Sequence, residues 1–287
     1  MILGYGLYGY NQAKAGDQRL KSRQLFSETK TLSAANQEGT QYEIPNLGDV
    51  VGFKISVTAS ATGTLTTPAK LSAIIRDFAV TDKKGEPITQ SIAGSDFLYL
   101  HYLTNASGTK ITETDFSGSA ATDTYMVQMS IDSNDLPAKI KFGFNPYSSA
   151  AASGATGGSA TVDVEVFYRD GTTTRTNRCY KQSLSLVSGT NEVAPYLNKK
   201  RILSKIGIGY TEANLTSVLI SSEGNEELNM KTAALQTYID TARAAAHISG
   251  KLLLPCAPFV ANDRSRLSIV TSSSGTLDLY QFMIDSA

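Results

Sequence analysis

Apolar and polar residues alternate with a period of two along much of the chain after residue 42. Because successive side chains of a strand point to opposite faces, this pattern is typical of strands that pack one face on a core. In the segment 50–57 it places Val51, Phe53, Ile55 and Val57 on one face. Three more strands are predicted by the sets Met126/Gln128/Ser130, Ile140/Phe142/Phe144 and Val162/Val164/Val166. The chain is therefore predicted to be all-β.

Three segments depart from this pattern. Residues 11–39 are polar and carry few large apolar side chains, so they predict an exposed helix or an extended segment, and we assign residues 1–41 to an N-terminal arm. Residues 226–247 place several apolar residues on one helical face and are followed by Gly250, which predicts one long helix. The apolar segment 91–105 fits either a short helix or a strand.

An internal repeat organises the rest of the chain. IPNL at 44–47, followed by the strand-like VVGFKISV, recurs as APYL at 194–197, followed by RILSKIGIGY. Each copy continues with a strand, a glycine-centred turn (DKKGEP or SSEGNEE) and a closing hairpin. The offset is 195 − 45 = 150 residues between the prolines and 224 − 85 = 139 between the turn glycines, which places an indel in a loop. Five elements in one order predict duplicated β domains at 42–178 and 179–287, with convergence of two unrelated sandwiches as the alternative.

Three of these motifs carry a resemblance to a known family. They are IPNLGDVVGFKISV (44–57), IRDFAVTDKKGEPI (75–88) and AGSDFLYLHYL (93–103). Together with the repeat, they resemble the double jelly-roll major capsid proteins of tailless icosahedral bacteriophages, which often have an internal membrane. The resemblance implies two tandem eight-stranded jelly rolls, with the long helix in the second roll.

The same resemblance implies how the chain would assemble. The family's subunits form homotrimers, which are pseudo-hexagonal capsomers of an icosahedral virion shell. It implies minor capsid and vertex proteins as further partners, and an N-terminal arm that points inward, toward an internal membrane or the genome.

Composition and charge agree with an assembling β protein. The 26 basic and 26 acidic residues cancel, which argues against a nucleic-acid binder with a basic face and removes one barrier to self-association. Ser and Thr occupy 61 of 287 positions, a composition that favours strands and turns. Only two cysteines occur, so no disulfide framework is expected, and we predict synthesis in a reducing host cytoplasm. Neither a membrane-spanning stretch nor a secretory signal is expected.

Residues that could support catalysis or metal binding are few. His101 and His247 are the only histidines, and no HxxxH, HxH or CxxC spacing occurs. The G-x-S-x-G elbow and the phosphate-binding loop are also missing. DFSGSAATD at 115–123 lacks the spacing of an EF-hand loop. We therefore predict no catalytic residue, cofactor or metal site and no enzymatic activity, and we leave the roles of Cys179 and Cys256 open.

Three classes of function suit a β-rich chain of this kind to different degrees. A carbohydrate-binding or adhesin-like β sandwich suits the hydroxyl-rich loops, but the chain has no Trp for stacking on sugar rings. A jelly-roll glycosidase or lyase would need paired carboxylates, and the sequence alone pairs none. A major capsid protein of a virion explains the duplication, the zero net charge and the lack of a catalytic set together. It is the function that the sequence favours.

Overall fold

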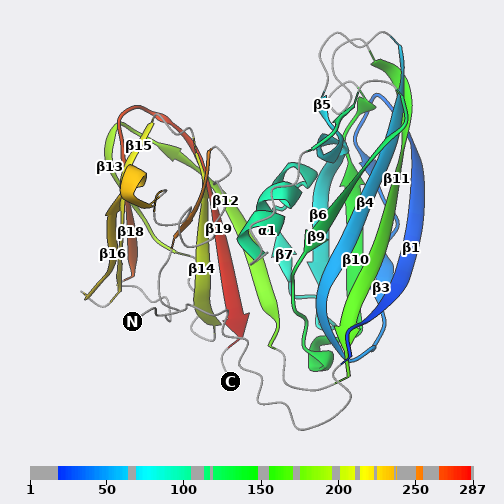
Figure 1. The fold of residues 1–287 in the computed structure, drawn as a ribbon, viewed down its shortest axis with the longest axis horizontal. Coiled ribbons are helices and arrows are strands. Elements are labelled where there is room, and N and C mark those ends of the chain that lie inside the picture. Colours follow the sequence, from blue (N-terminus) through cyan, green and yellow to red (C-terminus); the bar gives the residue numbers. More distant parts are fainter. Residues whose placement is uncertain are drawn as a thin grey trace.

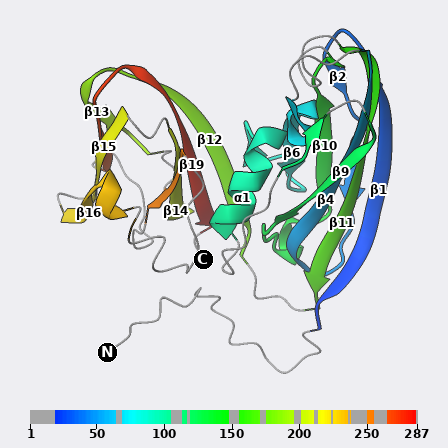
Figure 2. The ribbon, with the colours of Figure 1, turned by 45° about the horizontal axis from the view of Figure 1, so that its top comes forward.

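A computed structural model of the chain describes residues 19–63, 69–104, 113–116, 119–147, 155–170, 175–195, 201–210, 214–222, 225–235, 237, 250–254 and 265–285. Two β sandwiches stand side by side, with helix α1 (Phe97–Thr104) between them (Figures 1 and 2). Across these ranges, no helix is long and apolar enough to span a membrane.

The first sandwich is a jelly roll. Its larger sheet has the order β1-β11-β4-β9, so the first strand pairs with the last, and in the facing sheet β10 lies between β6 and the short β2 and β3. A two-stranded sheet pairs β5 with β8. The bounds are β1 (Lys21–Leu32), β2 (Gln37–Glu38), β3 (Tyr42–Ile44), β4 (Asp49–Gly63), β5 (Ala69–Lys70), η1 (Leu71–Ile74), β6 (Ile75–Thr81), β7 (Thr89–Gln90), η2 (Gly94–Asp96), β8 (Asp115–Phe116), β9 (Ala121–Val127), η3 (Ser133–Asp135), β10 (Ala138–Phe144) and β11 (Ala155–Arg169).

The second sandwich repeats this order. One sheet runs β17-β14-β19-β12 and the facing sheet runs β13-β18-β15-β16. The bounds are β12 (Asn177–Leu186), β13 (Gly189–Val193), β14 (Arg201–Gly209), β15 (Leu215–Ser222), β16 (Asn225–Lys231), β17 (Lys251–Leu254), β18 (Arg266–Thr271) and β19 (Gly275–Asp285). Pro45 precedes β4 and Pro195 precedes β14, so the two prolines enter corresponding strands, as the repeat predicts. The fold is all-β with two jelly rolls.

Strand β7 joins the two rolls through its main chain. It returns alongside β6, where Ile88 N donates to Val80 O (2.7 Å) and Phe78 N donates to Ile92 O (2.8 Å). On its other side it pairs in parallel with β12, with Cys179 opposite Thr89. The second roll's sheet therefore continues into the first roll without a break in hydrogen bonding.

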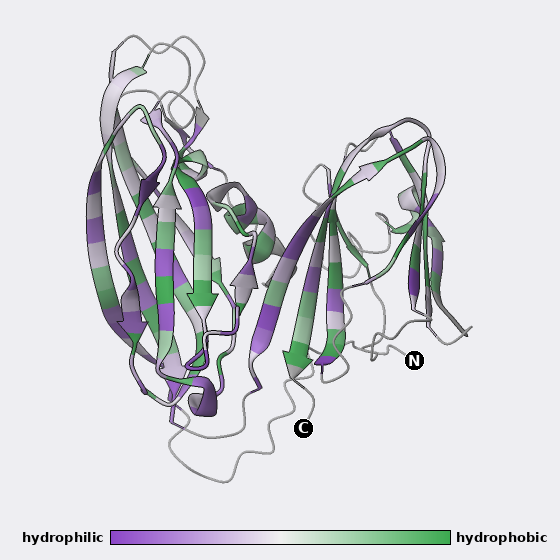
Figure 3. Cartoon of the chain, turned by 180° about the vertical axis from the view of Figure 1, so that it is seen from behind, coloured by the Kyte–Doolittle hydropathy of each residue, from purple (hydrophilic) through white to green (hydrophobic). Residues whose placement is uncertain are grey.

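The core of the first roll is aromatic. Phe78 on β6 contacts Phe53, Phe142 and Phe97, with ring centroids 6.5, 5.2 and 5.6 Å away. Phe97 opens α1 and also contacts Tyr125 of β9 (5.5 Å). Because rings packed at these distances stabilise beyond their buried area, Phe97 anchors α1 across the open side of the roll, between β6 and β9. The strands show the alternation of apolar and polar residues that this core requires (Figure 3).

The predicted N-terminal arm, residues 1–41, is too long, because a strand of the first roll lies within it. Residues 21–32 form β1, which pairs with β11 over its whole length, from Lys21 opposite Tyr168 to Leu32 opposite Gly158. Phe26 and Leu32 are buried, and Phe26 stacks on Tyr42 at 3.8 Å. Few large apolar residues are needed here, because β1 is an edge strand with one face in water. The first roll thus begins near residue 21, not 42; residues 1–18 lie outside the described part.

The predicted helix at 226–247 was wrong at its start. Residues 225–231 form β16, which pairs with β15, and the helical residues described begin at Thr232. Most of the remaining segment lies outside the described residues. The other ambiguous segment, 91–105, contains η2 and α1.

The predicted inward-facing residues of β4 also need correction, and two other strands show the same effect. Val51 is only half-buried, because β4 has a bulge there and Val50 is buried instead. Ile202 is likewise half-buried, and the register shift near Leu203 brings Leu203 inward. On β9 the buried side chains are Asp123, Tyr125 and Val127, and the residues of the set Met126/Gln128/Ser130 are exposed or half-buried. A one-residue shift in register moves a whole set of side chains to the other face.

Removal of β1 tests the corrected boundary. A chain that begins at Gln41 loses Phe26 and Leu32 from the core and leaves the edge of β11 unpaired. Burial of each such side chain stabilises by about 1.5–3 kcal/mol, so we expect the first roll to lose most of its stability. A chain that begins at Arg19 keeps every described strand and serves as the control. Urea unfolding followed by circular dichroism compares them, and equal transitions for both would contradict this boundary.

Candidate functional site: the seam between the two rolls

The surface where the rolls meet carries buried ion pairs and hydrogen bonds between the two halves of the chain. We call it the seam. On the first roll it comprises the β6–β7 turn, β7, η2 and α1 (residues 82–104), and on the second roll it comprises β12, β14, β17 and β19. Its side chains form two polar clusters, one at the β6–β7 turn and one at η2.

The β6–β7 turn fixes the carboxylate of Asp82. Its Oδ1 accepts hydrogen bonds from the backbone N–H groups of Lys84 and Glu86, both at 2.9 Å. Gly85 completes the turn with φ +84°, a conformation that glycine adopts without strain. With Oδ1 occupied by the turn, Oδ2 is left to face the second roll.

Arg178 of β12 binds this carboxylate in a buried ion pair. Its Nη2 lies 2.8 Å from Asp82 Oδ2 and its Nη1 donates to Pro87 O at 2.9 Å, while only about 2 % and 1 % of the two side chains are exposed. Burial acts to raise the pKa of Asp82, but the hydrogen bonds from Arg178 and from the turn outweigh it, so the pKa lies below its ordinary value. Asp82 therefore remains ionised beside the guanidinium.

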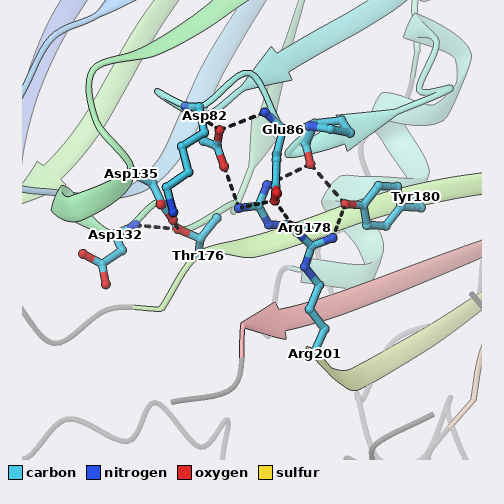
Figure 4. A network of polar contacts seen from close by, with 10 residues as sticks. Asp82, Glu86, Asp132, Asp135, Thr176, Arg178, Tyr180 and Arg201 are labelled. Atoms are coloured by element: carbon cyan, nitrogen blue, oxygen red, sulfur yellow. Dashed lines mark hydrogen bonds and ion pairs between the residues drawn. The ribbon is translucent and has the colours of Figure 1, made fainter. Parts of the chain in front are cut away.

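Further contacts extend this first cluster (Figure 4). Arg201 of β14 donates to Glu86 Oε2 and to the Tyr180 hydroxyl, both at 2.8 Å. Tyr180 in turn donates to Pro87 O at 3.1 Å. Thr176, just before β12, donates to a carboxylate oxygen of Asp135 in η3. Two segments of the first roll, the β6–β7 turn and η3, thus contact this end of the second roll.

The second cluster is centred on Asp96 of η2. Its carboxylate accepts from Ala93 N (2.7 Å), from the Lys181 ammonium (2.9 Å) and from the Tyr280 hydroxyl. Burial alone would lower the pKa of Lys181, but the carboxylates of Asp96 and Asp278 outweigh it and hold that pKa above its ordinary value. Burial and the charge of Asp96 raise the pKa of Tyr280, so its hydroxyl keeps the proton that it donates.

Tyr99 of α1 packs against the second roll's sheet. Its hydroxyl donates toward the carbonyl oxygens of Ile208 (3.2 Å) and Leu252, and its ring contacts Tyr280 edge to face at 4.7 Å. The Lys251 ammonium lies 4.9 Å from the centre of the Tyr99 ring. A Cβ on Gly209 would come within 2.9 Å of that ammonium, so glycine leaves the space that Lys251 occupies. Burial lowers the pKa of Lys251, although nearby carboxylates oppose the shift.

Charge is divided between the two rolls. In the ion pairs across the seam the first roll supplies the carboxylates of Asp82, Glu86 and Asp96, and the second roll supplies Arg178, Arg201 and Lys181. Because the opposite charges lie on different rolls, these ion pairs favour one relative position of the two rolls. Among the described residues no group of His, Cys, Asp and Glu side chains could hold a metal ion.

The residues singled out in the sequence are scattered. Cys179 lies inside the seam, where its N–H donates to Ile88 O (2.8 Å) and burial raises the pKa of its thiol. His101 lies on α1, whereas His247 and Cys256 fall outside the described residues. In the loop 115–123, Asp123 accepts from Thr114 N and Oγ1 (2.8 and 2.6 Å).

Sequence reasoning missed the seam itself. The motifs at 75–88 and 93–103 contain Asp82 and Asp96, but no pattern pointed to their partners Arg178 and Lys181. The one available signal was the presence of Arg178 and Lys181 in a segment that otherwise has the polar composition of an edge strand.

Loss of the buried ion pair should destabilise the protein strongly. Arg178→Met leaves the Asp82 carboxylate buried without its partner, which typically costs about 3–5 kcal/mol. Arg201→Met is the matched control, because the side chain of its partner Glu86 is 57 % exposed and an exposed carboxylate loses only about 1 kcal/mol. Urea unfolding at neutral pH measures both variants. Equal losses for the two would contradict a dominant role for the buried pair.

The same pair predicts a pH dependence. Because the folded-state pKa of Asp82 lies below its ordinary value of 3.8, its contribution to stability is complete above about pH 4 and is lost as the pH falls through the lower folded value. Asp82→Asn cannot titrate and should lose this part of the dependence. Unfolding free energies measured from pH 6 to pH 2.5 compare the two proteins; parallel curves for wild type and variant would contradict it.

The comparisons with known proteins show the fold of the chain and nothing further. No family model and no curated protein sequence matches the chain. Among solved structures, the STIV MCP, from Sulfolobus turreted icosahedral virus, is similar with a TM-score of 0.69 at 10 % identity, over 93 % of this chain and 97 % of that chain. The major capsid protein P2 from bacteriophage PM2 is similar with a TM-score of 0.60 at 13 % identity, over 91 % and 97 %. The chain therefore shares the double jelly-roll fold of these two capsid proteins.

Proposed function

We propose that the chain is the major capsid protein of a tailless icosahedral virus. The observation that carries this proposal is the extent of the structural likeness: both rolls, in one arrangement, correspond to nearly the whole of two capsid proteins. A match of one sandwich would have little functional meaning, since jelly rolls occur in proteins of many activities. A match of two rolls and their relative position is far more restrictive.

The contacts of the seam support the proposed role as a capsid protein. A capsid tile has to keep its shape while its edges contact neighbours, and buried ion pairs between the rolls oppose rotation of one roll against the other. The zero net charge adds support, because many copies can then pack without long-range repulsion. The role proposed is structural and needs neither a cofactor nor a small-molecule substrate.

The finer features of the proposal come from the family that the chain resembles. Three chains form a pseudo-hexagonal capsomer, and capsomers form the virion shell together with minor capsid and vertex proteins. The shell is assembled in the host cytoplasm. As partners of the residues before β1, we propose an internal membrane or the genome.

Electron microscopy of the purified protein tests this function. We expect light scattering to give the mass of three chains of 30.7 kDa each, and negative-stain images to show tiles of hexagonal outline. A protein that remains monomeric at all concentrations and under assembly conditions would contradict the proposal. Binding to a glycan array without any assembly would favour the carbohydrate-binding alternative instead.

A further inference from the structure

A small cavity opens at one end of the second roll, between its two sheets. It lies where the turn between β18 and β19 approaches the ends of β12 and β14 and the start of β15. Its volume is about 30 Å³, which admits one or two groups of the size of a water molecule. A larger ligand would therefore insert one small group and keep the rest of its structure at the mouth.

The floor of this cavity is apolar. Leu186, Leu215 and Leu277 are only 7 %, 5 % and 2 % exposed, so they form its deep part. A methyl group that enters leaves water for an apolar surface, which is favourable. None of the described residues that line the cavity carries a charge, so an ionised group would find no partner there. The cavity suits a neutral molecule that has a small apolar group.

The rim of the cavity is polar. Asn214 lies there half-buried, and Ser273 and Thr276 are exposed. Within the described part of the chain, these three side chains make no hydrogen bond to another residue. An amide and two hydroxyls both donate and accept, so they can bind a neutral polar group without breaking a bond inside the protein.

Main-chain contacts fix the turns around the cavity. Ser272 N donates to Asn214 O (2.8 Å), which joins the β18–β19 turn to the start of β15. Thr271 Oγ1 donates to Val187 O (2.8 Å) and Ser188 Oγ donates to Ser272 O (3.0 Å), which join it to the turn after β12. A site that is held in place before binding loses less conformational entropy when a ligand arrives.

We propose that this cavity binds the acetamido group of an N-acetylhexosamine residue in a polysaccharide. The methyl group contacts the leucine floor, and the amide N–H and C=O bond to the polar rim. The sugar ring stays at the mouth, where Tyr210 supplies an aromatic side chain. A hexose without the acetamido group has no methyl to insert, and an acidic sugar would meet no positive charge.

The position of the cavity gives this binding a place in the virion, and this step rests on the proposed function. The cavity lies at the end of the second roll opposite to the start of β1 and the end of β19, which are at the bottom of Figure 1. In the proposed shell the residues before β1 face the interior. The cavity then faces outward, and the polysaccharide is one on the surface of the host cell.

Ligand-observed NMR on the full-length protein tests the proposal. The probes are the methyl β-glycosides of N-acetylglucosamine and of glucose, which differ in the acetamido group. In saturation-transfer spectra we expect the acetyl methyl protons to give the strongest signal. Asn214→Leu keeps the size of the side chain but removes its amide, so we expect the affinity to fall about tenfold. Asn46→Leu is the matched control, because Asn46 is an exposed asparagine between β3 and β4 of the first roll.

The outcomes separate the cavity from the capsid function. Binding of the acetamido probe by wild type and Asn46→Leu, with weaker binding by Asn214→Leu, supports the proposal. Equal binding by all three proteins, equal affinity for both probes, or no saturation transfer overturns it, and trimers seen by light scattering then leave the capsid function standing. A monomeric protein that binds the probe supports the cavity and overturns the capsid function.

A second variant applies if Asn214→Leu fails to fold. Thr276→Arg places a long side chain across the mouth from an exposed position, so it leaves the core unchanged. We expect it to lose binding of the acetamido probe, and unchanged binding would overturn the proposal.

Discussion

The buried ion pair between Asp82 and Arg178 is the constraint on which the arrangement of the two rolls depends. Asp82 is held by its own turn, and Arg178 also donates to Pro87 O, so each charge is fixed by neighbours as well as by its partner. A buried pair adds little net stability compared with apolar packing, but any displacement that separates it is costly. The pair therefore acts chiefly on the relative position of the rolls.

The division of charge across the seam determines which surfaces can meet. Two first rolls brought together in the same way would oppose carboxylates to carboxylates, and two second rolls would oppose Arg178 and Lys181 to their own copies. Like charges held close in a desolvated contact are strongly unfavourable. The duplicated halves, though alike in topology, are thus not interchangeable, and their difference lies in side chains and not in strand order.

The sequence pattern predicted the strands that have one apolar face and the duplication that repeats them, because burial of one sheet face imposes a period of two. It failed for β1, where Phe26 and Leu32 are the buried apolar residues in a strand that is otherwise polar. It failed for β16, where a helical period continued back into a strand. The contacts across the seam were not predicted for another reason. Asp82 and Arg178 are 96 residues apart in the sequence, and no local sequence pattern indicates a contact between residues that far apart.

The pairing of β1 with β11 has a consequence for synthesis on the ribosome. Lys21 pairs with Tyr168, so the first strand made must wait for 168 − 21 = 147 further residues before its partner emerges. An unpaired strand edge is where nascent chains of the same kind adhere to each other, and a polar strand resists this. The polar sequence of β1 prevented its identification from the hydrophobic pattern. The same polar sequence helps the strand to remain soluble and unpaired until β11 has been synthesised.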